Sequence, residues 1–339
     1  MYFVVTGKNS YLSSKELKLF GFDSFKRISK NILLIDSYNP DDLDKLGGVI
    51  KYGKIISFDQ IKNYLNNKDI IGTNSKTFGL KLKKTFGIKK FKLIQPENTD
   101  LEVKNHGKEF LFFEDKVLLV EGYQKIDLYE TIDYQKPSRG MKVGMMPSKL
   151  AHIMINLCTG SATGQVETIY DPFVGFGTTG FVANYFGYNF LGSDINTTPA
   201  KQNLSFWKQT DYYKNMQFTL FKNDVKTPFE KKFLNNVDCI VTEGWLGPVI
   251  NNNTTQKMLT KNHEDIYNLY NAFLQNISKF YDNICMVFCF PIYSKMTNYG
   301  FGVLNKLEKG NMEFDFEKLG KPYKRDGQLV GRQIILAKK

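Results

Sequence analysis

The sequence predicts an α/β protein, in which a Rossmann-like domain with a mostly parallel sheet follows a smaller α+β domain. Three observations carry this prediction. Between Thr168 and Gly180, TIYDPFVGFGTTG, an apolar strand enters a glycine-rich turn and continues into an apolar helix. Strands and helices go on alternating after it, as in a doubly wound sheet. The chain closes on two strands, within 323–328 and at Val330–Ala337, that predict a final antiparallel hairpin.

Residues 1–130 are expected to form the α+β domain, because short apolar strands alternate there with helical patterns. Strands are expected at Tyr2–Thr6, within Arg27–Asp36, at Val49–Phe58 and at Thr77–Leu80. The stretch Glu109–Tyr123 predicts a hairpin that turns at Glu114 and Asp115. This half shows no catalytic arrangement based on Ser, His or Cys, so we expect it to bind a partner.

Residues 131–147, TIDYQKPSRGMKVGMMP, are expected to form a linker, because they contain Pro and Gly and show no strong periodicity. Residues 148–339 are expected to form the Rossmann-like domain. Its first helix begins near Ser148, where apolar residues recur at helical spacing. Further strands are expected at Asn189–Asp194, Met216–Phe221, Val237–Thr242 and in the run ICMVFCFP.

The glycine-rich turn predicts a cofactor site. Gly175, Gly177 and Gly180 satisfy the dinucleotide pattern G-x-G-x-x-G, but tight turns favour glycine whatever they bind. Asp171 at the end of the strand is more informative. A carboxylate there would repel a pyrophosphate, yet it could accept hydrogen bonds from an ammonium group. S-adenosylmethionine (SAM) carries an ammonium, a sulfonium and no phosphate, so Asp171 favours SAM.

Two further acidic residues follow successive strands. Asp194 ends the second strand, where a carboxylate can hold the ribose hydroxyls of either NAD or SAM. Asp224 follows the third strand, where SAM enzymes often contact the adenine amino group. An ordinary turn residue is the alternative for Asp224.

The fourth strand leads into Glu243-Gly244-Trp245-Leu246-Gly247-Pro248. Amino-group methyltransferases place an acidic-aromatic loop at this position. The lone pair of an exocyclic amine is delocalised into the base, so an oxygen that accepts the amine hydrogens helps to direct it at the methyl group. Glu243 is the expected acceptor, and Trp245 is expected to stack on the base. The alternative is a surface turn with Trp245 packed on the core.

The chain has 339 residues, a net charge of +12 and a pI near 9.2, which favours a polyanionic partner. A lysine-rich proteome encoded by an AT-rich genome is the alternative. The charge is locally concentrated, however, because Asp69 and Glu97 enclose a stretch without acidic residues. This stretch contains Lys76, Lys81, Lys83, Lys84, Lys89, Lys90 and Lys92. We expect it to contact phosphates.

The composition argues against a membrane protein, a secreted protein and a metal-binding protein. Apolar residues make up 42% and charged residues 24%, and no apolar run is long enough to cross a membrane. The first residues do not resemble a signal peptide, so we expect a cytoplasmic protein without a membrane partner. Four scattered cysteines and three histidines show no metal-ligand spacing, and the cysteines are expected to be structural free thiols.

Several blocks in order resemble the RNA guanine-N2-methyltransferases with a THUMP-type amino-terminal region. They are MYFVVTGKNSYLSSKEL, TFGLKLKK, RGMKVGMMPSKLAHIMINL, DPFVGFGTTG, LGSDI and VGRQIILA. The resemblance implies a class I SAM-dependent methyltransferase fold, a seven-stranded sheet with an antiparallel last strand, and tRNA as the partner. It implies cofactor contacts at Asp171, Pro172, Phe173, Gly175, Gly177, Thr178, Asp194 and Asp224. RNA contacts are expected at Lys81, Lys83, Lys84, Lys89, Lys90 and Arg139.

One block departs from the family. Its tRNA enzymes typically carry D-P-P-Y-G where this chain has Glu243-Gly244-Trp245, and Gly244 is expected to loosen a loop that Pro would stiffen. Three alternatives therefore stay open: a DNA amino-methyltransferase of the N6-adenine or N4-cytosine type, a degenerate RNA-binding protein, and a dinucleotide oxidoreductase. Asp171 and the closing hairpin disfavour the last.

Overall fold

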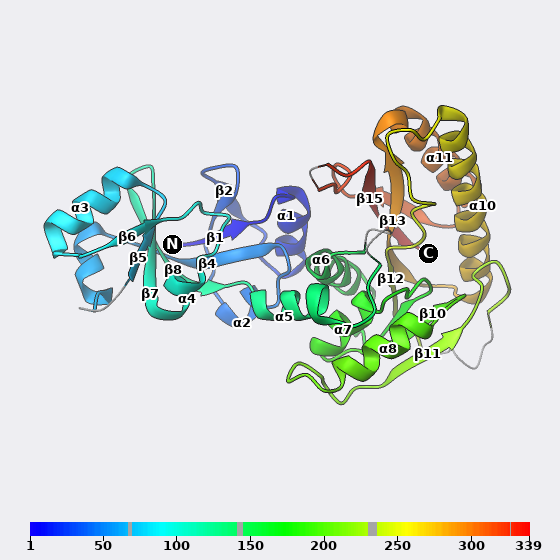
Figure 1. Ribbon diagram of the computed structural model, residues 1–339, viewed down its shortest axis with the longest axis horizontal. Coiled ribbons are helices and arrows are strands. Elements are labelled where there is room, and N and C mark those ends of the chain that lie inside the picture. Colours follow the sequence, from blue (N-terminus) through cyan, green and yellow to red (C-terminus); the bar gives the residue numbers. More distant parts are fainter. Residues whose placement is uncertain (67–69, 141–144, 230–235, 326) are drawn as a thin grey trace. The chain divides into compact units, whose positions relative to one another are not determined.

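The computed structural model describes residues 1–339 except 67–69, 141–144, 230–235 and 326. The chain forms two compact units, Met1–Lys125 and Ile126–Lys339 (Figure 1). The division falls slightly before the expected domain end at residue 130. The described part of the expected linker, 131–147, belongs to the second unit, where Ile132 and Lys136 are buried.

The first unit is built on an eight-stranded sheet in the order β2-β3-β1-β4-β8-β7-β5-β6. Its strands are β1 (Tyr2–Thr6), β2 (Phe25–Arg27), β3 (Ile32–Ile35), β4 (Val49–Ile56), β5 (Ile70–Thr73), β6 (Phe91–Leu93), β7 (Gly107–Phe113) and β8 (Lys116–Tyr123). Its helices are α1 (Ser10–Leu19), α2 (Pro40–Leu43), the 3-10 helix η1 (Phe58–Tyr64), α3 (Lys76–Phe86) and α4 (Leu101–His106). The predicted hairpin is confirmed as β7 and β8, and Glu114 and Asp115 form its turn with positive φ.

The prediction of a strand at Thr77–Leu80 is wrong, because these residues lie in helix α3. Ser75 caps the helix by accepting a hydrogen bond from the Phe78 N–H, and Gly87, in the left-handed conformation, ends it. Phe78 and Leu82 are one turn apart and are both buried, which is helical periodicity. The TFGLKLKK block therefore does not form the strand that the resemblance implied.

The second unit contains a seven-stranded sheet in the order β11-β10-β9-β12-β13-β15-β14. Its strands are β9 (Thr168–Asp171), β10 (Asn189–Asp194), β11 (Phe218–Lys222), β12 (Cys239–Thr242), β13 (Cys285–Tyr293), β14 (Asp315–Lys318) and β15 (Val330–Lys338). The strands from β11 to β13 pair in parallel, whereas β15 is antiparallel to both of its neighbours. This is the strand order of the class I SAM-dependent methyltransferase fold, so the predicted fold class is confirmed.

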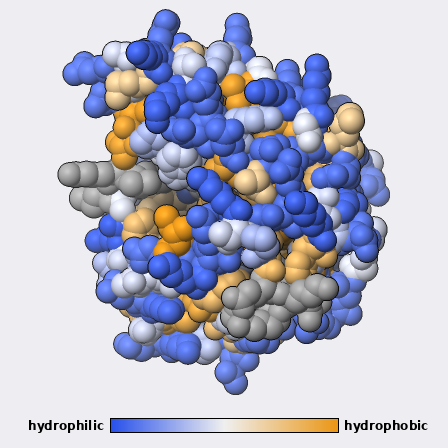
Figure 2. All heavy atoms as spheres, turned by 90° about the vertical axis from the view of Figure 1, so that its right-hand side faces the viewer, coloured by the Kyte–Doolittle hydropathy of each residue, from blue (hydrophilic) through white to orange (hydrophobic). Residues whose placement is uncertain are grey.

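Helices cover both faces of this sheet (Figure 1). The described helices of this unit are α5 (Ile126–Glu130), the π-helix η2 (Thr131–Gln135), α6 (Ser148–Thr159), α7 (Thr178–Tyr185), α8 (Thr198–Trp207), α10 (Gln256–Phe280), the 3-10 helix η3 (Ser294–Met296) and α11 (Thr297–Gly310). In Figure 1, α6 and α7 lie on the opposite side of β12 and β13 from α10 and α11. Tyr270 and Phe273 of α10 are fully buried in the main core, whereas the outer face seen in Figure 2 is mainly hydrophilic.

Candidate active site

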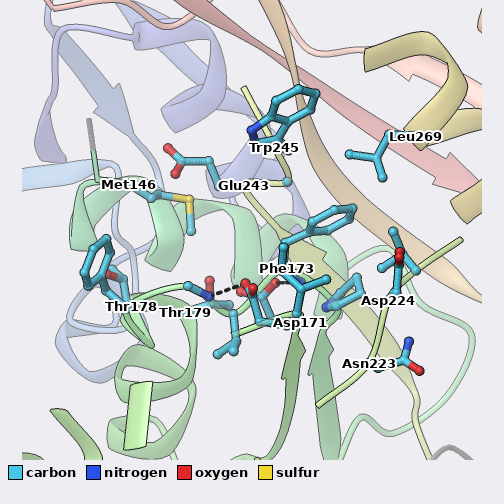
Figure 3. Close-up of a pocket in the computed structure, with 18 of the residues that line it drawn as sticks. Met146, Asp171, Phe173, Thr178, Thr179, Asn223, Asp224, Glu243, Trp245 and Leu269 are labelled. Carbon is cyan, nitrogen blue, oxygen red and sulfur yellow. Dashed lines mark hydrogen bonds between the residues drawn. The ribbon is translucent and has the colours of Figure 1, made fainter. Parts of the chain in front are cut away.

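A cavity of about 570 Å³ opens at the carboxyl ends of the central strands. It lies where open α/β sheets bind their ligands, because the loops after parallel strands converge at that edge. The predicted cofactor and catalytic residues that line it are Asp171, Pro172, Phe173, Gly175, Thr178, Asp194, Asp224, Glu243 and Trp245. In Figure 3, Thr178 and Thr179 lie on one side of Asp171, and Asn223 and Asp224 lie on the other.

The three glycines of the turn have separate structural roles. Gly175 and Gly177 have φ of 49° and 86°, a conformation that favours glycine. Gly177 does not line the cavity but precedes α7, and a Cβ there would lie 2.8 Å from the Phe181 ring. A Cβ on Gly180 would lie 2.6 Å from Phe190, so this glycine lets the helix pack closely on β10.

Asp171 is a buried carboxylate at the centre of the cavity, with 2% of its surface exposed. Its Oδ1 accepts a hydrogen bond from the Phe173 N–H at 3.0 Å, and the Thr242 and Thr179 hydroxyls also bond to it. Burial raises the pKa of Asp171 to about 7, against the opposing effect of these hydrogen bonds. All three partners are neutral, so a cationic ligand group would stabilise the ionised form.

Asp194 is held at the end of β10 by two backbone amides. The Gly175 N–H donates to its Oδ2 at 3.0 Å, and the Asn196 N–H donates to its Oδ1 at 3.1 Å. Each oxygen keeps a lone pair for a ligand hydroxyl. The Gly175 amide is therefore already engaged, and it is one of the turn donors that a pyrophosphate would need.

Asp224 is a turn residue that also lines the cavity. Its Oδ1 accepts a hydrogen bond from the Lys226 N–H at 3.0 Å, which is the local bond expected of a turn residue. Its side chain is nevertheless exposed and lines the cavity next to Asn223. The turn fixes the carboxylate at the cavity wall.

The loop 243–248 contacts side chains of the core through its backbone carbonyls. The Tyr270 hydroxyl donates to the Cys289 carbonyl at 2.7 Å, and its oxygen lies 3.4 Å from the Glu243 carbonyl oxygen. The Tyr293 hydroxyl donates to the Leu246 carbonyl at 3.1 Å. Gly244 has φ of 69°, which proline cannot adopt. The glycine therefore fits a backbone conformation that a D-P-P-Y loop could not have at this position.

Glu243 forms an ion pair that the sequence analysis missed. The Arg332 Nε donates to Glu243 Oε1 at 2.6 Å, and the two side chains are 3% and 18% exposed. Burial raises the pKa of Glu243, whereas the charges of Arg332 and Lys136 oppose that rise. The Met146 backbone N–H also donates a hydrogen bond to this carboxylate. Because each carboxylate oxygen has two lone pairs, Glu243 can still accept a hydrogen from a ligand. A signal was present, because Arg332 is a charged residue within the apolar strand VGRQIILA.

Trp245 is 38% exposed and lies at the rim of the cavity, above Phe173 in Figure 3. The surface-turn alternative supposed that Trp245 is packed on the core, and this exposed position does not agree with it. A second cavity of about 500 Å³ is lined by loop residues 243–252 and by Arg332. Glu243, Gly244 and Trp245 line both cavities, so this loop separates the candidate cofactor site from space for an acceptor.

The predicted RNA contacts lie in both units. In the first unit, Lys81, Lys83 and Lys84 are exposed on α3, and Lys89 and Lys90 are exposed just after it. Lys81 Nζ also lies 4.2 Å from the centre of the Phe58 ring. Arg139 belongs to the second unit, where it is exposed and donates to the Tyr134 carbonyl at 2.7 Å.

Other site types find no support in the described residues. No group of three His, Cys, Asp or Glu side chains among them could hold a metal ion. All four cysteines are buried free thiols. None of the described helices has the length and apolar character that crossing a membrane requires.

Comparisons with known proteins give a family match over part of the chain. The family model of a DNA methylase, N6_N4_Mtase, matches residues 55–205, less than half of the chain. The matched range includes the glycine-rich turn and Asp194 but ends before Glu243. No curated protein matches the chain.

Solved structures give remote similarities. One is a candidate RNA methyltransferase from Pyrococcus horikoshii, with 14% identity, 64% of this chain and 97% of that chain covered, and a TM-score of 0.37. Another is the rRNA methyltransferase AviRa from Streptomyces viridochromogenes, with 13% identity, 49% and 82% covered, and a TM-score of 0.33. A third is magnesium protoporphyrin IX methyltransferase from Synechocystis PCC 6803, with 13% identity, 63% and 93% covered, and a TM-score of 0.36. Their substrates differ and the scores are low, so the fold assignment rests on the strand order itself.

Proposed function

We propose that this protein is a SAM-dependent methyltransferase that methylates an exocyclic amine of a nucleobase, with guanine N2 in tRNA as the favoured target. One observation carries the proposal. Asp171 and Asp194 end the neighbouring strands β9 and β10, while Asp224 and Glu243 come just after β11 and β12. All four line one cavity at the carboxyl edge of the sheet.

The cavity residues fit SAM better than a dinucleotide. Bound SAM would supply an electrophilic methyl group on a sulfonium. Asp171 would accept the ammonium group of its amino-acid part, which offsets the desolvation of a buried carboxylate. Asp194 would accept the ribose hydroxyls. Asp224, beside Asn223 and exposed at the cavity wall, would accept the adenine amino group.

Glu243 would prepare the acceptor amine. Arg332 and the Met146 N–H hold its carboxylate in place, and a remaining lone pair would accept an amine hydrogen and direct the nitrogen lone pair at the methyl carbon. As the amine takes the methyl group, S-adenosylhomocysteine would be the leaving group, and the Glu243 carboxylate would accept the proton that the amine loses. Trp245 at the rim would stack on the base, which must leave its helix to enter the site.

Two features favour tRNA as the substrate. Lysines are exposed on and just after α3, and sequence blocks in the second unit resemble those of the RNA guanine-N2-methyltransferases. DNA is the second candidate, because the family model that matches residues 55–205 is that of a DNA methylase. The two substrates share the same transfer chemistry, so the cavity does not separate them.

The test incubates the purified protein with methyl-tritiated SAM and either total RNA or genomic DNA, followed by separation of the labelled nucleosides. We expect label in N2-methylguanosine from the tRNA fraction. Label in N6-methyladenine or N4-methylcytosine would instead identify the DNA alternative. Label in neither nucleic acid, from a protein that binds S-adenosylhomocysteine, would contradict the proposed activity and favour the degenerate binding protein.

A further inference from the structure

Lys136 is a buried cation beside the cofactor cavity. It is 1% exposed, and its Nζ donates a hydrogen bond to Thr178 Oγ1 at 2.7 Å. Within the described parts of the chain, no carboxylate forms an ion pair with it. Burial lowers the pKa of Lys136 to about 8, and the charges of Asp133 and Glu243 oppose that fall. The lysine is therefore mainly protonated at neutral pH, and a buried charge is costly without a counter-ion.

Thr178 connects Lys136 to the cavity. It is the first residue of α7, and it lines the cavity while its oxygen accepts the lysine hydrogen bond. Because that oxygen accepts from Lys136, the hydroxyl hydrogen points away from the ammonium and is available to a ligand. In Figure 3, Thr178 lies on the side of Asp171 opposite Asn223 and Asp224. Thr178, to which Lys136 is bound, thus lies on the other side of Asp171 from Asp224, the expected adenine contact.

We propose that Lys136 and Thr178 form the site for the cofactor's carboxylate, with Thr178 as the hydrogen-bond donor and Lys136 as the source of positive charge. The proposal rests on the proposed function, because it takes the ligand to be SAM. In an α-amino acid the ammonium and the carboxylate are attached to the same carbon. If Asp171 holds the ammonium, the carboxylate must lie within a few ångströms of Asp171, and a nearby cation is needed to offset the repulsion. Thr179, which bonds to Asp171, is the chain neighbour of Thr178.

The test compares two ligands that differ in the amino-acid part. S-adenosylhomocysteine has it, whereas 5′-methylthioadenosine keeps the adenosine and the thioether sulfur but lacks the carboxylate and the ammonium. In the Lys136→Met variant, the affinity for S-adenosylhomocysteine measured by calorimetry should fall about 10- to 100-fold, the scale of a lost charged hydrogen bond. The affinity for methylthioadenosine should change less than about twofold. Lys201→Met, at an exposed position on α8, is the matched control and should change neither affinity.

Each other outcome overturns the inference. An equal loss for both ligands would mean that Lys136 only supports the fold of the cavity. No loss for either ligand would mean that the carboxylate binds elsewhere. If Lys136→Met does not fold, Thr178→Val should show the same selective loss, and an unselective result there would also contradict the proposal. A wild-type protein that binds neither ligand would instead contradict the proposed function itself.

Discussion

The cofactor end of the cavity and the acceptor loop are held in different ways. At the cofactor end, each Asp is oriented by the amide two residues further along: Phe173 N–H to Asp171, Asn196 N–H to Asp194, and Lys226 N–H to Asp224. These are local turns that repeat after three strands. In the loop 243–248, only Gly244 is held in this local way, by Thr242. Its other contacts include Arg332, Tyr270 and Tyr293, which are distant in the sequence.

Because of this difference, we expect one set of residues to determine cofactor affinity and the other to determine the rate of turnover. The geometry of the cofactor contacts is built into each strand end and depends little on the rest of the core. The position of Glu243 depends instead on α10, β13 and β15 packing correctly around the loop. We therefore expect substitutions at the first region to reduce cofactor affinity, and substitutions at the second to reduce turnover while the cofactor still binds.

The largest expected effect is at Asp171. Asp171→Asn keeps the shape and the hydrogen bond from Phe173 but removes the charge that would hold the ligand ammonium. Calorimetric affinity for S-adenosylhomocysteine should fall about 1,000-fold, the scale of an unpaired buried charge. Unchanged affinity would show that Asp171 does not contact the ammonium.

A stability measurement distinguishes this loss from misfolding. The pKa of Asp171 is raised to about 7, so between pH 4 and 7 the folded protein holds a proton that the unfolded chain has released. Its stability without ligand therefore falls as pH rises through that window. Asp171→Asn removes this penalty, so at pH 8 the unliganded variant should resist urea more than the wild type. Lower stability would point to a damaged fold.

Glu243 should give the opposite pattern. Glu243→Gln removes the charge that Arg332 holds in place and weakens acceptance of the amine hydrogens. We expect kcat to fall about 100-fold, with affinity for S-adenosylhomocysteine changed less than about twofold. Glu313→Gln, at an exposed position between α11 and β14, is the matched control and should leave kcat unchanged. Normal turnover by the Glu243 variant would exclude it as the acceptor.

Gly244 tests how rigidly the loop is anchored. A Cβ there would lie 2.0 Å from the hydroxyl of the buried Tyr270, and the φ of 69° is itself strained for alanine. Gly164→Ala is the matched control, because Gly164 also has positive φ but no atom within 4 Å of such a Cβ. Urea unfolding should show Gly244→Ala to be destabilised by about 2 kcal/mol more than Gly164→Ala. Equal effects would indicate a loop that moves freely.

The smallest effect is expected at the first unit. Replacing Lys81, Lys83 and Lys84 by Gln should weaken tRNA binding about tenfold at low salt and reduce the slope of log affinity against log salt by about 2. Replacing Lys26, Lys30 and Lys62 by Gln changes the charge equally at other exposed positions of the same unit. The same slope in both triple variants would mean that tRNA binding depends on the net charge of the unit and not on the position of the lysines on α3.

The comparison between the two regions also explains what the sequence could predict. The acidic residues at the strand ends were identified because their position depends on local order along the chain. Arg332 was missed because its pairing with Glu243 spans a large sequence separation. Helix α3 was missed because Gly79 sits within TFGLKLKK, and glycine disfavours a helix interior. In the structure the Phe91 ring packs on that glycine, where a Cβ would lie 2.4 Å from it, so tertiary packing outweighs propensity.

The strand β14 is a second element that the sequence does not predict. Asp315–Lys318 is short and polar, and it forms the edge of the sheet by pairing with β15. In the predicted partner segment, within 323–328 and described except for residue 326, Tyr323 forms an antiparallel bridge to Arg332. The antiparallel ending of the sheet was predicted correctly, but its edge strand lacks the apolar alternation by which strands are recognised.

The most direct test of the central claim is a calorimetric titration of the wild-type protein with S-adenosylhomocysteine and, separately, with NAD. We predict saturable binding of S-adenosylhomocysteine at one site per chain and no binding of NAD, because buried Asp171 requires a cation and the Gly175 amide is already engaged by Asp194. Binding of NAD, or of neither ligand, would contradict the assignment of this cavity to SAM.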